Sequence, residues 1–182
     1  MSRIGKQITI LNQGVSANLT LEKGEQLLKV KGPLGELSRY FRPEIKIEIE
    51  GDGIKTTPTS ESIFQRALWG TYSSHIKNMV EGVTNGFKKN LIVEGIGFKV
   101  QVSGEKLVFS LGFSHPVEMK IPKGIKATAE KNNLTIFGID KELVGQFSEN
   151  ITALKKPEPY KGKGIKYEGQ VIKLKQGKKT VA

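Results

Sequence analysis

A segment late in the chain combines positive charge, an aromatic ring and glycines at close spacing. It reads Lys155-Lys156-Pro157-Glu158-Pro159-Tyr160-Lys161-Gly162-Lys163-Gly164-Ile165-Lys166 and is called the basic loop below. Two prolines stiffen the chain, Tyr160 can stack on a base or reach a phosphate, and the glycines let backbone N–H groups approach phosphate oxygens. The simpler alternative is an exposed connector whose lysines only keep it solvated. Solubility alone requires neither the prolines nor the glycines, so we predict contact with a nucleic acid.

Positive charge is concentrated in and after this loop. The chain has 182 residues, with 29 Lys+Arg against 18 Asp+Glu and a formal net charge of +11. Residues 155–182 hold nine of the lysines and two of the acids, which places +7 of the net charge in this last part. Such a density indicates a polyanionic partner, although on charge alone a solvated tail that maintains solubility is an equal alternative.

Residues for catalysis or metal binding are scarce. The absence of cysteine excludes disulfides, thiol nucleophiles, thiolate-bound zinc and iron–sulfur clusters. His75 and His115 are the two histidines, and neither has acidic or histidine neighbours at a ligand spacing. Gly95-Ile96-Gly97 lacks the third glycine of a dinucleotide-binding turn, and Lys179 occupies the Ser/Thr position of a phosphate loop. We therefore expect no enzyme, no metal, no cofactor and no small-molecule substrate.

Targeting and membrane signals are also weak. The positively charged start, Met1 to Lys6, is followed by an apolar run of only Ile8 to Leu11, which is too short for a signal peptide. Nothing in the sequence approaches the roughly 18 apolar residues of a membrane span. We expect a cytoplasmic protein with no membrane partner.

The elements that would position the basic loop belong to a sequence that repeats once. Gly24-Glu25-Gln26-Leu27-Leu28 with Gly32 aligns with Gly104-Glu105-Lys106-Leu107-Val108 with Gly112, and Pro43 aligns with Pro122. Two such units indicate a duplication rather than a solenoid. We predict two similar domains, residues 1–82 and 83–175, followed by a basic tail at 176–182.

Each half predicts short strands followed by one late helix. Period-two alternation and turn residues place strands at 15–21, 26–31, 36–41, 45–49 and 54–57, and in the second half at 91–94, 98–102, 107–111, 117–121, 125–129 and 134–137. The first helix should be capped by Thr59 or Ser60, bury a face running from Ile63 to Val80 and stop at Gly82.

The second helix should be capped by Asp140 and end before Pro157, and a last strand should run from Ile165 to Leu174. This order predicts an α+β fold in which each half is a small, mostly antiparallel β-sheet packed against one α-helix.

Residues Pro157 to Ile165 resemble the signature of bacterial-type ribosomal large-subunit protein six, the universal uL6 family. Family segments also appear, in the same order, at Met1–Lys6, Val30–Leu37, Gly86–Gly97 and Leu111–Val117. The resemblance implies a duplicated fold and binding to large-subunit rRNA near the stalk base and the sarcin–ricin region, beside neighbouring ribosomal proteins. It also implies main RNA contacts in the second domain. The lack of a transit segment favours the ribosome of the bacterial cytoplasm over an organellar one.

The predicted RNA-binding set combines the basic loop, the tail and the N-terminal segment. It consists of Arg3, Lys6, Lys155, Lys156, Tyr160, Lys161, Gly162, Lys163, Gly164, Lys166, Lys173, Lys175, Lys178 and Lys179. Lysines stand at 155, 156 and 166 where the family often has arginine, and a lysine cannot make the bidentate contact of a guanidinium group.

Two functions of other classes stay open at this point. One is a small enzyme acting on an anionic substrate, which lacks a credible nucleophile or acid–base pair. The other is an adaptor that binds an acidic protein through the tail. Loss of association after nuclease treatment would favour RNA, and persistence would favour a protein partner.

Overall fold

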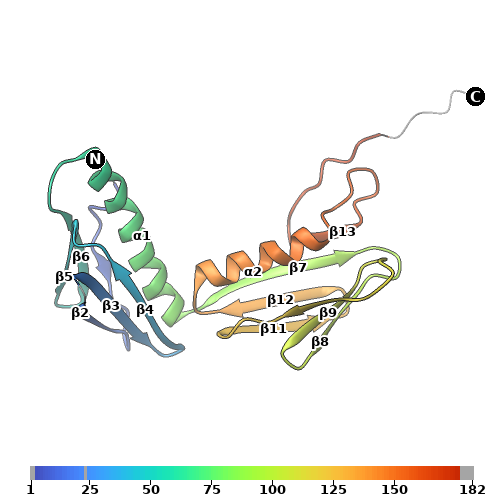
Figure 1. Ribbon diagram of the computed structural model, residues 1–182, viewed down its shortest axis with the longest axis horizontal. Helices are drawn as coiled ribbons and strands as arrows, with labels where there is room; N and C mark the ends of the chain where they lie inside the picture. Colours follow the sequence, from blue (N-terminus) through green and yellow to red (C-terminus); the bar gives the residue numbers. More distant parts are fainter. Residues whose placement is uncertain (1–2, 23, 177–182) are drawn as a thin grey trace, which may run out of the picture. The chain divides into compact units, whose positions relative to one another are not determined.

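The computed structural model describes residues 3–22 and 24–176. These residues form two compact units (Figure 1). Unit 1 runs to Gly86 and includes Ile139–Lys141, and unit 2 comprises Phe87–Gly138 and the chain from Glu142 onward. The division after Gly86 lies close to the domain boundary predicted after residue 82.

Unit 1 contains two three-stranded antiparallel sheets and one long helix. Its elements are β1 (Thr9–Ile10), β2 (Ser16–Glu22), β3 (Glu25–Gly32), β4 (Gly35–Phe41), β5 (Ile45–Glu50), β6 (Gly53–Pro58) and α1 (Ile63–Thr84). The strand orders are β1-β6-β5 and β2-β3-β4. Leu28, Val30 and Ile54 from the strands and Ile76 and Val83 from α1 pack in one buried cluster. The expected alternation of apolar residues therefore builds the core of this unit.

The first helix differs from its prediction at both ends. It begins at Ile63, because the Ser62 hydroxyl rather than Thr59 or Ser60 accepts the N–H of Gln65, at 3.2 Å. The predicted buried face is wrong in the first turn, where Ile63 and Phe64 are exposed. The helix also continues through the buried Gly82 and ends at Thr84, since Gly86 supplies the left-handed conformation, with φ +72°.

Unit 2 repeats this arrangement and adds one strand. Its elements are β7 (Phe87–Glu94), β8 (Lys99–Ser103), β9 (Lys106–Ser110), β10 (Val117–Lys120), β11 (Ile125–Glu130), β12 (Asn133–Gly138), α2 (Lys141–Leu154) and β13 (Gly164–Tyr167). The strand orders are β11-β12-β7-β13 and β10-β9-β8. Leu91, Leu134 and Ile165 from the larger sheet, Phe109 from the smaller one and Ile151 from α2 share one core. The α+β class and the duplication are confirmed, with two sheets rather than one in each unit.

The last strand is shorter than predicted. β13 ends at Tyr167, because Gly169 turns the chain at φ +79° and the Gln170 N–H bonds to the Tyr167 carbonyl at 3.1 Å. Residues 170–176 follow as coil, with Val171 and Leu174 exposed. The lysines at 173 and 175 therefore lie on coil and not on a strand.

Neither helix in the described part of the chain is long and apolar enough to cross a membrane.

Candidate nucleic-acid interface

The basic loop connects the end of α2 to β13 and is closed by backbone hydrogen bonds. The Ile165 N–H donates to the Lys155 carbonyl, and the Glu158 N–H donates to the Lys163 carbonyl, both at 2.8 Å. Gly162 donates its N–H to the Glu158 carbonyl at 2.9 Å. Three such bonds hold the two legs of the loop together, so its side chains project from a defined backbone.

Gly164 allows the two legs of the loop to approach each other. Its φ is +146°, and an added Cβ would lie 2.6 Å from the Cα of Pro157 and 2.7 Å from the carbonyl oxygen of Lys156. No side chain fits at that distance from backbone atoms. Glycine is therefore needed at this position so that the two legs of the loop can pack against each other.

Gly162 fixes the turn rather than offering an amide to a ligand. It has φ +72°, a left-handed conformation that glycine adopts without strain. Its N–H is already bonded to Glu158. This finding changes the expected mechanism, since at Gly162 the glycine shapes the loop and does not present a free backbone donor to phosphate.

The coil after β13 runs back along the basic loop. The Lys175 N–H donates to the Pro159 carbonyl at 2.8 Å, and Leu174 lies 3.7 Å from the position of an added Cβ on Gly162. Figure 1 shows the loop and this coil side by side beyond β13. Lys173 and Lys175, which follow the loop in sequence after β13, thus share its surface.

Two of the predicted lysines have partners inside the protein. Lys155 places its Nζ 4.8 Å from the centroid of the Phe113 ring, a cation–π contact. Lys166 places its Nζ 2.8 Å from Glu94 Oε1, and its side chain is only 20% exposed. The sequence offered no signal for either contact, because Glu94 and Phe113 come from distant parts of unit 2.

The remaining described lysines of this surface are available to a ligand. Within the described residues none of them has an ion pair with an acid, and all are exposed or half-buried: Lys156, Lys161, Lys163, Lys173 and Lys175. Tyr160 lies among them with 55% of its surface exposed, so its ring is open to stacking. Five ammonium groups and a ring on a fixed backbone suit a phosphate backbone with accessible bases.

The other predicted residues lie elsewhere. Arg3 and Lys6 are exposed residues of unit 1, whereas the basic loop belongs to unit 2. Lys178 and Lys179 lie outside the described residues.

Tyr167, next to the interface on β13, is held in place by α2. Its hydroxyl donates to Glu149 Oε2 at 3.1 Å, and the Nζ of Lys89 lies 5.6 Å from its ring centroid. Burial and, secondly, the hydrogen bond to Glu149 raise the pKa of the phenol above its usual value. Tyr167 therefore stays neutral at physiological pH and acts as a structural anchor for β13.

The described residues contain no group of three or more histidines or acids that could hold a metal ion. What the surface offers is fixed positive charge and one stacking ring. Such a surface can bind a polyanion, and the described residues around the loop bring no nucleophile and base together on it.

Comparison with known proteins finds relatives that match both units. The family model for ribosomal protein L6 matches residues 13–86 and 94–168, one match in each unit. Large ribosomal subunit protein uL6 of Thermotoga maritima is 44% identical over 188 residues, covering 99% of this chain and all of the relative. The protein of the same name from Bacillus cereus is 46% identical over 179 residues, covering 98% of both chains. That of Persephonella marina is 44% identical with the same coverage.

Proposed function

The chain belongs to the family of ribosomal protein L6, and from this premise we propose that it is a structural constituent of the large ribosomal subunit that binds large-subunit rRNA through unit 2. Membership in this family identifies a structural protein and not an enzyme. The observation that carries the proposal is a set of five lysines on the basic loop and the adjoining coil, which share this surface with Tyr160 and have no acidic partner among the described residues. We propose in addition that the site of binding lies near the stalk base and the sarcin–ricin region, beside neighbouring ribosomal proteins, in the cytoplasmic ribosome.

Electrostatics support the choice of RNA over a small anion. The lysines are spread along a loop and a coil rather than gathered around a cavity, which fits a run of phosphates better than a single phosphate group. The exposed ring of Tyr160 adds a stacking surface, which sequence-specific RNA contacts commonly use.

Hydroxyl-radical footprinting tests the proposal. Large subunits that contain the wild-type chain should show protected rRNA positions near the stalk base and the sarcin–ricin region. Particles that contain a Lys161→Ala, Lys163→Ala variant should lose part of that protection. Protection confined to other rRNA regions would refute the proposed location, and association that survives complete nuclease digestion would point to a protein partner instead.

A further inference from the structure

Strand β1 of unit 1 occupies the place that β7 occupies in unit 2. Each pairs antiparallel with the strand that precedes the helix, β6 or β12. The Leu11 N–H donates to the Asp52 carbonyl at 2.7 Å, and the Val93 N–H donates to the Asn132 carbonyl at 2.8 Å. The two bonds lie at the same point of the two hairpins, so Ile10 corresponds to Ile92.

The two strands differ on their other side. In unit 2, β13 pairs antiparallel with β7, with Lys166 opposite Ile92 and the fully buried Ile165 opposite Val93. In unit 1, β1 is the last strand of its sheet, and no other strand of the described chain lies beyond it. Unit 1 thus leaves open the position that β13 fills in unit 2.

Backbone hydrogen-bonding groups face this open position. In an antiparallel pair, successive residues direct their N–H and C=O groups alternately to one side and the other. Because the Leu11 N–H bonds toward β6, Thr9 and Leu11 face β6 while Ile8 and Ile10 present their groups to the open side. In unit 2 the same alternation directs the groups of Ile92 toward β13.

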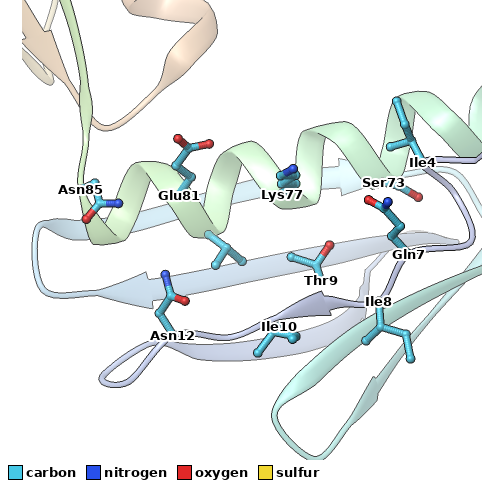
Figure 2. A pocket seen from close by; sticks show the side chains of 11 residues that line it. Ile4, Gln7, Ile8, Thr9, Ile10, Asn12, Ser73, Lys77, Glu81 and Asn85 are labelled. Atoms are coloured by element: carbon cyan, nitrogen blue, oxygen red, sulfur yellow. The ribbon is translucent and has the colours of Figure 1, made fainter.

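A groove of about 500 Å³ lies beside β1 and is walled by α1. Figure 2 shows Thr9 directed toward α1, and Ile8 and Ile10 directed away from it. Ile8 is 52% exposed and Ile10 is 71% exposed. Proteins commonly protect open sheet edges with charges or proline, and the residues from Ile8 to Leu11 include neither.

The opposite edge of the same sheet, at β5, has two of its backbone groups paired inside the unit. The buried amide of Gln26 on β3 accepts the N–H of Ile47 at 3.1 Å and donates to the carbonyl of Ile45 at 2.7 Å, both on β5. In unit 1, a side chain thus forms hydrogen bonds with backbone groups at the β5 edge, whereas the outward backbone groups of β1 remain available to a partner.

We propose that β1 accepts an extended segment of another protein of the large subunit, which pairs with it antiparallel in the position that β13 takes in unit 2. The segment would place one aliphatic side chain between β1 and α1, as Ile165 does beside β7. A peptide fits better than RNA, because the donors and acceptors of an extended peptide alternate at the same spacing as those of the strand edge. The α1 wall also carries charges of both signs, Lys77 and Glu81, rather than the basic surface that a phosphate backbone prefers.

The test uses large subunits that carry the full chain, whose presence in the particles is first verified by mass spectrometry. The inference rests on the proposed function, and the presence of the chain in the particles tests that function independently of whether β1 is paired. Hydrogen exchange is then compared between the free protein and the particle for peptides that span residues 7–11. We expect exchange to slow at least tenfold in the particle, because the outward amides of Ile8 and Ile10 gain acceptors. Unchanged exchange would overturn the inference.

A photoreactive amino acid at position 10 identifies what covers the edge. We expect cross-links to a single segment of one ribosomal protein, whereas the same group at Ile63, which is 88% exposed, should not reach that segment. Cross-links only to rRNA, or only to a second copy of this chain, would refute a partner strand.

Paired substitutions separate backbone pairing from side-chain packing. Ile10→Pro removes one outward N–H and should abolish the cross-link made from position 8, whereas Ile10→Ala keeps the N–H and should retain most of it. Both variants should melt like the wild type, because the Ile10 side chain is largely exposed. Equal cross-linking by the two folded variants would contradict strand pairing.

Discussion

Lys161 and Lys166 both belong to the basic loop, but their charges have different uses. Lys161 is exposed and has no acidic partner among the described residues, whereas Lys166 is bound to Glu94 at 2.8 Å. We expect Lys161→Ala to weaken binding to the cognate rRNA fragment by about tenfold and to lower the salt slope of binding by roughly one. Lys166→Ala should leave that slope nearly unchanged and reduce the free energy of unfolding by about 0.5 kcal/mol.

Filter binding at several salt concentrations and urea denaturation measure the two effects. A Glu94→Gln, Lys166→Ala double variant serves as the control, because it removes both charges of the ion pair. Equal losses of rRNA affinity for the two single lysine variants would show that Lys166 leaves Glu94 to bind RNA.

Gly162 tests whether the shape of the loop matters as well as its charge. Its φ of +72° is strained for a β-branched residue but tolerated by asparagine. We expect Gly162→Val to weaken rRNA binding at least as much as Lys161→Ala, and Gly162→Asn to bind nearly like the wild type. Far-UV circular dichroism should change little in either variant, because the loop lies outside the helix and strand cores.

Isothermal titration with the rRNA fragment measures this difference. Wild-type affinity in Gly162→Val, alongside a loss in Lys161→Ala, would mean that the loop acts only as a string of charges.

At the scale of elements, Gly164 joins the basic loop to β13. Both Gly164 and Gly169 have positive φ, but only at Gly164 would an added Cβ meet backbone atoms, at 2.6 Å from Pro157. We expect Gly164→Ala to reduce the free energy of unfolding by about 1–3 kcal/mol, since the loop or the start of β13 must move. Gly169→Ala should cost only about 1 kcal/mol, because strain is its sole penalty.

Thermal melting of the two variants distinguishes the clash from the strain. Gly164→Ala should also weaken rRNA binding, whereas Gly169→Ala should not. Similar melting temperatures would show that the loop relieves the contact at Pro157 without loss of structure.

Period-two alternation was sufficient to predict most strands, because each buries one face. It failed for β1, which has only two residues, and for the end of β13, where apolar residues continue to Leu174 although the chain has turned at Gly169. The N-cap of α1 was misplaced because several hydroxyl residues precede this helix, and only the fold selects Ser62.

The basic loop could be predicted as a binding site from the sequence, since its charged residues are close together in the chain. The partners of Lys155 and Lys166 could not, because Phe113 and Glu94 reach them only through the sheets of unit 2.

At the scale of the whole molecule, the duplication produced two units of similar architecture and unequal charge. The proposed rRNA surface has five described lysines without acidic partners among the described residues, and all five belong to unit 2. Unit 1 also has exposed lysines, such as Lys29 and Lys31 on β3, but they lie outside this surface. The same fold can therefore serve RNA binding in one copy and other contacts in the other.

This asymmetry predicts a steep salt dependence that arises in unit 2. If about five lysines each neutralise one phosphate, log K for the rRNA fragment should fall with log[salt] at a slope of roughly −3 to −5. Neutralising Lys161 and Lys175 together should reduce the magnitude of the slope by roughly two, since each lost phosphate contact means that about one counterion fewer is released from the RNA on binding. Neutralising Lys29 and Lys31 removes the same charge and should leave the slope unchanged. Equal reductions in the two double variants would mean that net charge, and not the surface around the basic loop, governs binding.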